Sequence, residues 1–310
     1  MIYNTFQSNS HETDPKTSIF LIIILLFCLL IIPAGCSRSN EKESSKSQSL
    51  QIKGSDTIVN LVQAWAEEYS KANSSVNIGI TGGGSGTGFA ALLNSTCDIA
   101  MSSRLAEEKE IKIATEKKKV LKEFKIGLDG LVVIVHPENP VSQLTLDQVR
   151  DIFMGNKTNW KDFAGNDLKI VILSRESNSG THMFFKEHVL RRGNKKGKEE
   201  FSTRALLMPS SQTIVNELEQ NPHAVGYVGM GYINPRLKAV AIAKNAATPF
   251  VAPVIENVIN DSYPISRPLF LYTNGEPSGI ARSFIDYALS ANGQIIVRKT
   301  DFVPIRKADK

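Results

Sequence analysis

The chain has 310 residues, of which 42% are hydrophobic, 22% charged and 7% aromatic. This composition is typical of globular proteins, and the length is sufficient for two domains. The formal net charge of +5 favours an anionic partner in a general way. The densest basic run, 191–198, contains two glycines, and basic residues elsewhere mostly alternate with acidic ones. We therefore expect a solvated turn there, and no nucleic-acid partner.

An apolar run near the N-terminus indicates the compartment. Residues 19–32 form an unbroken stretch of 14 apolar side chains. A membrane-spanning helix needs about 20 such residues, whereas the apolar core of a secretory signal needs about 7 to 15. A polar, serine-rich stretch, 37–49, follows shortly afterwards. The pattern predicts a signal peptide over 1–35 and a polar tether over 36–49.

The residues around Cys36 resemble the lipobox of a bacterial lipoprotein, because small residues precede the cysteine and the polar stretch follows it. The resemblance implies that Cys36 becomes a lipidated N-terminus, which would anchor the protein to a membrane outside the cytoplasm. Pro33 departs from the pattern, since a leucine is common there, and Lys16 is the only basic side chain before the apolar run. Plain secretion and an uncleaved anchor are the alternatives.

The cysteines fit this interpretation. Cys28 would be lost with the signal peptide and Cys36 would carry the lipid, so Cys97 alone would remain in the folded part. No intramolecular disulfide is therefore expected. A single free cysteine is commonly buried and inert, and we assign Cys97 no chemistry.

Strand-like and helix-like patterns alternate along the rest of the chain. In chain order they predict strand 49–53, helix 58–71, strand 76–80, helix 89–93, strand 98–101, strand 131–135, helix 146–153, strand 169–173, helix 181–191, helix 214–219, strand 225–228, strand 268–273 and helix 280–289. Such alternation favours an α/β fold with a largely parallel sheet. Prolines and an asparagine interrupt this pattern at 136–140, and the chain is expected to return to the first lobe near 262–268. We therefore predict two lobes, the first discontinuous (50–135 plus 264–310) and the second 136–263.

Three loops share one pattern. Residues 54–57, 82–88 and 177–181 each follow a strand, are rich in Ser, Thr and Gly, and open a helix. A helix start exposes unpaired N–H groups and carries a partial positive charge, so it can bind an anion. Ser, Thr and Asp are also good N-cap residues, which would explain any one loop by itself.

Two arginines lie close to these loops in the sequence. Arg175 ends the strand before the third loop, where its guanidinium could form two hydrogen bonds with an oxyanion. Arg104 occupies a similar position after strand 98–101. A surface ion pair is the alternative for Arg175.

Motifs for other chemistry are absent or weak. The glycine-rich loop lacks the Gly-Lys-Ser/Thr ending of a nucleotide phosphate loop, and its match to a dinucleotide fingerprint does not directly follow a strand. There is no Gly-x-Ser-x-Gly elbow, and His136, His182, His188 and His223 show no metal-ligand spacing. The sequence therefore favours binding without catalysis, metal or cofactor; an oxyanion-site hydrolase is the alternative from another class.

At these residues the chain resembles the phosphate-binding proteins of bacterial ABC transporters, which have the class II periplasmic-binding-protein fold. The resemblance runs from about residue 50 to the C-terminus and rests on six segments in the expected order: 54–57, 82–88, 98–104, 146–160, 175–181 and 263–268. It implies two lobes, each a mostly parallel sheet flanked by helices, joined by two hinge strands.

The resemblance also implies a set of phosphate contacts. These are Thr57 with the amide of Ile58, Ser85, Arg175, Ser179, Gly180 and Thr181. Two positions depart from the best-known members, because Ser103 and Ser177 stand where aspartates are found. Certain relatives have Ser-Arg at the first of these positions, so Ser103 and Arg104 are expected to contact the ligand together.

The loss of the first aspartate affects selectivity. A carboxylate accepts the proton that phosphate keeps at neutral pH and repels sulfate, which has no proton to donate. Our hypothesis is that Asp56 supplies this acceptor; the alternative is that Asp56 only caps helix 58–71.

The function implied is capture of inorganic phosphate between the lobes and its delivery to the membrane subunits of an ABC importer, by a monomer without a cofactor. The alternatives are a binding protein for another oxyanion, such as sulfate or molybdate, and a surface adhesion or signalling lipoprotein built on the same scaffold.

Overall fold

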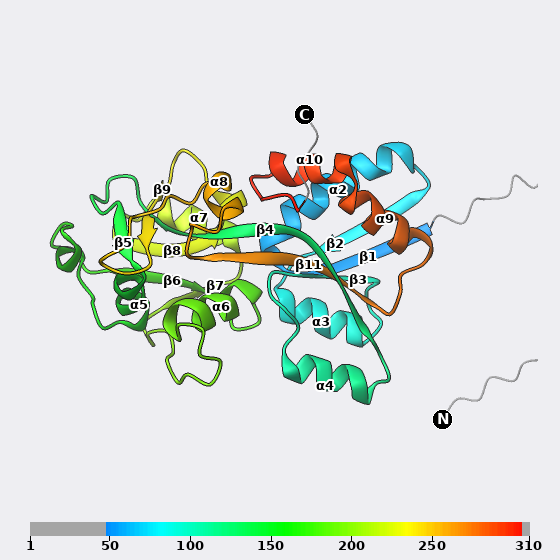
Figure 1. The fold of residues 1–310 in the computed structure, drawn as a ribbon, viewed down its shortest axis with the longest axis horizontal. Helices are drawn as coiled ribbons and strands as arrows, with labels where there is room; N and C mark the ends of the chain where they lie inside the picture. Colours follow the sequence, from blue (N-terminus) through cyan, green and yellow to red (C-terminus); the bar gives the residue numbers. More distant parts are fainter. Residues whose placement is uncertain (1–47, 306–310) are drawn as a thin grey trace, which may run out of the picture. The chain divides into compact units, whose positions relative to one another are not determined.

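A computed structural model describes residues 48–305 of the chain (Figure 1). The predictions for the signal peptide, Cys28 and the lipid site Cys36 lie outside these residues. The tether was predicted to reach 49, but the first strand already begins at Gln48. Helices and strands alternate through most of the described part, which confirms the predicted α/β class.

The strands of the described residues form one large sheet and one small sheet. Their bounds are β1 Gln48–Gly54, β2 Val76–Thr81, β3 Ile99–Ser102, β4 Leu121–Val135, β5 Gln143–Thr145, β6 Val171–Arg175, β7 Leu206–Met208, β8 Ala224–Gly229, β9 Lys238–Ala239, β10 Ala241–Ala243 and β11 Ser266–Asn274. The large sheet has the order β2-β1-β3-β11-β4-β8-β6-β7, with β9 also paired to β4. The small sheet pairs β5 with β10.

The large sheet is parallel at both ends and antiparallel in the middle. Strand β1 runs parallel to β2 and β3, and β6 runs parallel to β7 and β8. Strands β11 and β4 are antiparallel to each other and to their outer neighbours. Residues 121–130 of β4 pair with β11, and residues 131–135 pair with β8, so β4 links the two parallel halves (Figure 1). This arrangement confirms the two-lobed fold with β4 and β11 as its hinge strands; the lobe boundaries in the sequence stay a prediction.

Helices cover the sheet. The α-helices are α2 Val59–Ala72, α3 Ser85–Leu93, α4 Glu108–Glu116, α5 Leu146–Met154, α6 Gly180–Phe185, α7 Ser211–Leu218, α8 Ile255–Ile259, α9 Gly279–Leu289 and α10 Ala291–Lys299. Shorter helical turns are η2 Asp56–Ile58, η3 Trp160–Phe163, η4 Lys186–Leu190 and η5 Met230–Tyr232; η4 is a π-helical turn that continues α6.

Apolar spacing and caps explain the helices that the sequence predicted. Helix α2 buries Leu61, Val62 and Trp65 on one face, and the Trp65 indole Nε1 donates to the Gly293 carbonyl at 2.8 Å. Helix α5 begins at a capping box formed by Thr145 and Gln148. The buried apolar face holds α2 against the core, whereas the capping box fixes where α5 begins.

Several elements were missed or predicted too short. Strand β4 begins at Leu121, ten residues before the predicted strand, because its first part alternates charged and apolar residues rather than forming a continuous apolar run. Helix α4 lies in a charged stretch with few apolar residues, and α10 was not predicted. Helix α3 begins at Ser85 and therefore includes Gly86 and Gly88, which the sequence placed in a loop.

Gly88 has a packing role. A Cβ built on this residue would lie 2.7 Å from the Gly54 Cα and 2.7 Å from the Lys53 carbonyl oxygen. Both are backbone atoms at the end of β1, which cannot move aside as a flexible side chain can. The absence of a side chain at Gly88 therefore lets α3 pack directly against β1.

We expect Gly88→Ala to lower the free energy of unfolding by about 2 kcal/mol, because the backbone clash outweighs the roughly 1 kcal/mol that alanine gains in a helix. Denaturant unfolding measures this. Gly86→Ala is the matched control in the same helical turn, because its nearest neighbour, the Asn178 carbonyl oxygen, lies at 3.2 Å. Equal stability of the Gly88→Ala and native proteins would refute the packing role.

His182 is a buried histidine next to the third loop. Its ring packs against Phe201 with centroids 4.5 Å apart, and Nδ1 lies 3.3 Å from the Ser174 hydroxyl oxygen. Burial, with a smaller contribution from Lys186, lowers the pKa of His182 to about 4. The imidazole is therefore neutral in the folded protein near neutral pH.

This burial predicts a loss of stability on acidification. As pH falls below about 6.5 the unfolded chain takes up a proton on His182, whereas the folded chain does not until about pH 4. The stability that depends on a neutral His182 is thus complete above about pH 6.5 and declines as pH falls. We expect the free energy of unfolding to drop by about 2 kcal/mol between pH 7 and pH 5 for this reason. His182→Gln should reduce the difference in unfolding free energy between these pH values by that amount; an unchanged difference would contradict the assignment.

Candidate anion-binding site

Hydroxyl groups from separate parts of the chain meet between the sheet and the helix starts. The Thr57 Oγ1 on η2 lies 2.6 Å from the Thr181 Oγ1 on α6, and both side chains are buried. Their positions are 124 residues apart in the sequence. The first and third predicted loops therefore meet through their hydroxyl groups.

The second loop joins the same cluster. The Ser85 Oγ accepts a hydrogen bond from the Ser103 backbone N–H at 3.0 Å and lies 3.4 Å from the Ser103 Oγ. A Cβ on Gly180 would lie 2.2 Å from the Ser85 Oγ, so the start of α6 lies directly against this serine. The Ser103 Oγ in turn accepts from the Ser55 hydroxyl at 2.9 Å. Ser85, Ser103 and Gly180 are thus brought together.

Backbone contacts hold the glycine-rich and third loops together. The Gly86 N–H donates to the Asn178 carbonyl at 3.0 Å, and the Asn178 side-chain amide donates to the Gly83 carbonyl at 3.0 Å. Gly83 and Gly84 adopt φ values of 124° and 111°, which side chains rarely allow. Glycine at these two positions permits the close approach.

The other predicted residues at the helix starts have local roles. Ser179 is the N-cap of α6 and accepts from the His182 N–H at 3.4 Å. The Ile58 N–H donates to the Ser55 carbonyl at 3.3 Å, and its side chain is buried. Ser177, the second departure from the family pattern, is exposed.

Arg175 lies at the end of β6 with its side chain 1% exposed. Its guanidinium donates from Nη1 to Asp56 Oδ2 at 2.8 Å and to the Ser211 hydroxyl at 3.0 Å. It also donates from Nε to the Met208 carbonyl and from Nη2 to the Pro209 carbonyl. A guanidinium has five N–H groups, so one N–H, on Nη2, is left without a hydrogen bond to the described residues. The two-bond contact with an oxyanion that we expected would require one of these bonds to open.

Asp56 pairs with Arg175 rather than capping α2 with its side chain. Its Oδ2 accepts from Arg175 and also from the Ser211 N–H at 2.8 Å. Its backbone carbonyl accepts from the Tyr232 hydroxyl at 2.7 Å. The Asp56 carboxylate is thus next to Thr57 in the sequence and forms an ion pair with Arg175.

The structure does not bring Arg104 to the hydroxyl cluster. Its guanidinium forms a two-bond ion pair with Glu110 on α4, at 2.7 and 2.8 Å, and lies over the Phe89 ring. In this conformation the Arg104 side chain therefore lies with Glu110, and joint contact of Ser103 and Arg104 with the ligand stays a prediction. Glu110 lies only six residues away in the sequence and provides a nearer, buried partner for the charge.

The sequence-based prediction missed a second buried arginine. Arg267 on β11 pairs with Asp129 on β4; its Nη2 lies 2.8 Å and its Nε 3.0 Å from Asp129 Oδ2. Its Nη2 also donates to the Thr181 Oγ1 at 3.0 Å. Burial raises the pKa of Asp129, and the adjacent guanidinium opposes this effect. An acidic residue next to the apolar run 131–135 was the available signal, but it could not identify its partner 138 residues away.

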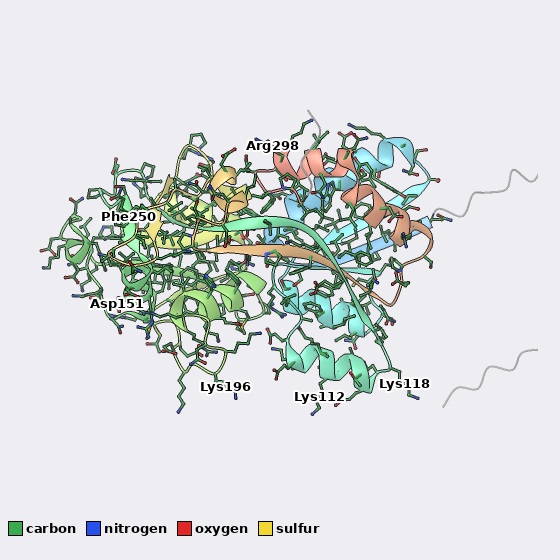
Figure 2. The ribbon with its side chains drawn as sticks, viewed as in Figure 1. Lys112, Lys118, Asp151, Lys196, Phe250 and Arg298 are labelled. Carbon is green, nitrogen blue, oxygen red and sulfur yellow. The ribbon has the colours of Figure 1, made fainter. Side chains whose placement is uncertain are left out.

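The charged surface of the second half carries local ion pairs. In the basic run 191–198, Arg191 pairs with Glu200 at 2.5 Å and Arg192 pairs with Asp147. Lys196 is exposed and points outward (Figure 2). The run forms a turn, as predicted.

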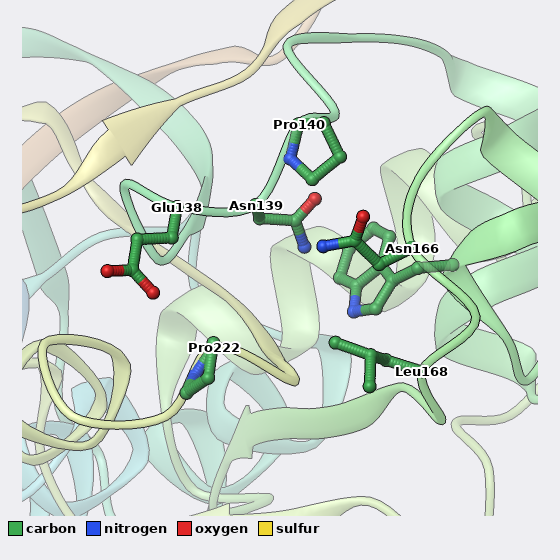
Figure 3. Close-up of a pocket in the computed structure, with 7 residues that line it drawn as sticks. Glu138, Asn139, Pro140, Asn166, Leu168 and Pro222 are labelled. Atoms are coloured by element: carbon green, nitrogen blue, oxygen red, sulfur yellow. The ribbon is translucent and has the colours of Figure 1, made fainter.

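A pocket of about 170 Å³ lies elsewhere. It is lined by Glu138, Asn139, Pro140, Trp160, Asn166, Leu168 and Pro222 (Figure 3). No predicted binding residue lines it. The indole of Trp160 donates to the His223 carbonyl at 3.0 Å and is almost fully buried, which indicates packing.

Three further properties hold for residues 48–305. No three His, Cys, Asp or Glu side chains there lie together in a way that could hold a metal ion. No helix of this part has the length and apolar character needed to cross a membrane. Cys97 is a buried free thiol, and burial raises its pKa to about 11.

Comparison with known proteins gives consistent results. The family model described as PBP superfamily domain matches residues 39–292. The chain is 34% identical over 283 residues to the phosphate-binding protein PstS of Pseudomonas aeruginosa, covering 86% of this chain and 85% of that protein. It is 30% identical over 301 residues to the phosphate-binding protein PstS of Bacillus subtilis, covering 94% and 95%.

Solved structures agree. A structure from Clostridium perfringens, assigned as a phosphate ABC transporter substrate-binding protein with bound phosphate, has a TM-score of 0.75 and 33% sequence identity. The match covers 84% of this chain and all of that one. The chain therefore belongs to the PBP superfamily and, within it, to the PstS-like family with the class II periplasmic-binding-protein fold.

Proposed function

We propose that this protein captures inorganic phosphate between its two lobes and delivers it to an ABC importer. The observation that supports this most strongly is the meeting of Thr57, Ser85 and Thr181, three hydroxyl residues at separate helix starts, beside the Arg175–Asp56 pair. The names of the relatives and the phosphate reported with the Clostridium perfringens structure point to the same ligand.

The way in which phosphate would bind follows from the hydrogen-bond donors at the site. The hydroxyls of Thr57 and Thr181 now bond to each other at 2.6 Å. We propose that an anion separates them, so that each donates to an oxyanion oxygen while the N–H groups of Gly180 and Thr181 and the remaining N–H of Arg175 complete the shell. The Ser179 N–H already donates to the Glu176 carbonyl at 2.9 Å. Charge-assisted hydrogen bonds contribute about 1.5–3 kcal/mol each. Several of them, less the costs of ordering and desolvation, are consistent with micromolar or tighter binding.

Closure would use the hinge strands. Strands β4 and β11 pair with each other over 121–130 and 266–274 and connect the two halves of the sheet. Bending of these strands would separate Thr57 and Ser85 from Thr181 and Arg175. This division assigns 50–135 plus 264–310 to the first lobe and 136–263 to the second.

The cellular setting is part of the proposal. Cleavage before Cys36 would leave a lipidated N-terminus that holds the protein at a membrane outside the cytoplasm, with the stretch from 37 onward as a tether. We propose that the protein acts as a monomer, that the closed lobes present phosphate to the membrane subunits of the importer, and that phosphate is bound without being chemically changed.

Selectivity for phosphate would depend on Asp56. Its Oδ2 is occupied by Arg175 and Ser211, whereas Oδ1 has no hydrogen bond to the described residues. That oxygen could accept the proton that phosphate retains at neutral pH. Sulfate has no proton and would be repelled by the same carboxylate. Asp56 would thus replace the aspartate that is absent at Ser103.

Arg175→Lys tests the site. Lysine keeps the charge but cannot hold Asp56, Ser211 and an anion together, so phosphate should bind about 10- to 100-fold more weakly by titration calorimetry. The matched control is Arg236→Lys, since the Arg236 side chain is 76% exposed. Native-like affinity of Arg175→Lys, or no phosphate binding by the native protein, would contradict the proposed function.

Asp56→Asn tests selectivity. Asparagine keeps the shape but loses the negative charge, so phosphate binding should weaken while sulfate binding strengthens, narrowing the ratio of their affinities by about 10-fold. Calorimetric titrations with both anions measure this ratio. If it equals that of the native protein, Asp56 is not the discriminating group.

A further inference from the structure

Burying the Arg267–Asp129 pair removes two charges from water, and this desolvation is unfavourable. The Arg267 and Asp129 side chains are 1% and 0% exposed. Replacing a buried ion pair with apolar residues of similar volume is often neutral or stabilising, so stability is a weak reason to keep it. The position of the guanidinium suggests a different role.

Arg267 reaches elements on both sides of the proposed site. Its Nη2 lies 3.0 Å from the Thr181 Oγ1 and 3.5 Å from the Thr57 Oγ1, and its Nη1 donates to the Ser103 carbonyl at 3.2 Å. Thr57 and Ser103 belong to the first proposed lobe and Thr181 to the second. The Arg267 guanidinium thus contacts both members of the Thr57–Thr181 hydroxyl pair, which joins the two proposed lobes.

This contact fixes the direction of one hydrogen bond at Thr181. A guanidinium can only donate, so the Thr181 Oγ1 accepts from Arg267. A hydroxyl that accepts from a cation becomes a better donor through its own O–H, because hydrogen bonds in a chain polarise one another. The Thr181 proton is therefore directed away from Arg267, and it is free to be donated to Thr57, 2.6 Å away, or to an anion that replaces it.

Asp129 holds the guanidinium in place. Its Oδ2 accepts from both Nε and Nη2 of Arg267, and its Oδ1 accepts from the Met230 N–H at 3.0 Å. Arg267 and Asp129 are also directly opposite each other in the β4–β11 register. The carboxylate is thus fixed at both oxygens, and it fixes the orientation of the guanidinium toward Thr181.

We propose that Arg267, anchored by Asp129, is a second arginine of the anion site and a positioning residue that orients the Thr181 and Thr57 hydroxyls as donors to a tetrahedral oxyanion. This inference rests on the proposed function and adds a residue that neither the loop pattern nor the family resemblance assigned.

The test removes the charge of the pair without leaving one partner buried alone. In the purified full chain, R267Q/D129N should bind inorganic phosphate about 10- to 100-fold more weakly than the native protein by calorimetry. The control is R150Q/E199Q, which neutralises the partly buried Arg150–Glu199 pair, 3.2 Å apart and without a contact to the hydroxyl cluster. That control should retain native affinity.

A double-mutant cycle separates positioning from general loosening of the fold. If Arg267 acts through the Thr181 hydroxyl, the loss caused by R267Q/D129N should shrink to about 3-fold or less when Thr181→Val is already present. An equal loss in both backgrounds would indicate an effect independent of that hydroxyl and would overturn the proposal. So would native affinity of R267Q/D129N.

Folding is checked by cooperative denaturant unfolding. If R267Q/D129N does not fold, Arg267→Lys replaces it in the same cycle, because it keeps a cation beside Asp129 and loses only the fork that reaches Thr181. Native affinity of Arg267→Lys would then overturn the proposal. Absence of phosphate binding by the native protein would instead refute the proposed function itself.

Discussion

A hydrogen bond of 2.6 Å between the hydroxyls of Thr57 and Thr181 joins residues that the chain places 124 positions apart. Such a contact requires two helix starts to face each other at the edges of two parallel half-sheets. The antiparallel strands β4 and β11 make this possible, because they join the halves and place the carboxyl ends of β1, β3 and β6 near one another. The site is therefore a consequence of the strand order.

Charge is balanced around this contact. Two buried arginines, Arg175 and Arg267, are each paired with a carboxylate, Asp56 and Asp129 respectively. Each guanidinium also donates to a hydroxyl, Arg175 to Ser211 and Arg267 to Thr181, in addition to its carboxylate partner. A site built in this way can accept an additional anion without an uncompensated cation being buried beforehand. The hydroxyls and helix N–H groups then supply directional donors.

The sequence predicted the parts of this site that depend on local pattern. A strand followed by Gly, Ser and Thr at a helix start is readable in one segment, and the loops 54–57, 82–88 and 177–181 were found in that way. The choice of Thr57, Ser85 and Thr181 within them came from the family resemblance. The sequence could not predict side-chain direction. Arg104 and Arg175 both follow strands, yet Arg104 turns to Glu110 within its own segment whereas Arg175 crosses to Asp56. Arg267 was missed because its partner lies on a neighbouring antiparallel strand, and no local pattern encodes that register.

The central claim is that these groups converge on one anion. The most direct measurement is a crystal structure of the protein grown with phosphate. The expected result is one tetrahedral anion within hydrogen-bond distance of the Thr57, Ser85 and Thr181 hydroxyls and of Arg175, with the Thr57–Thr181 hydrogen bond broken. Phosphate bound elsewhere, with that hydrogen bond intact, would contradict it.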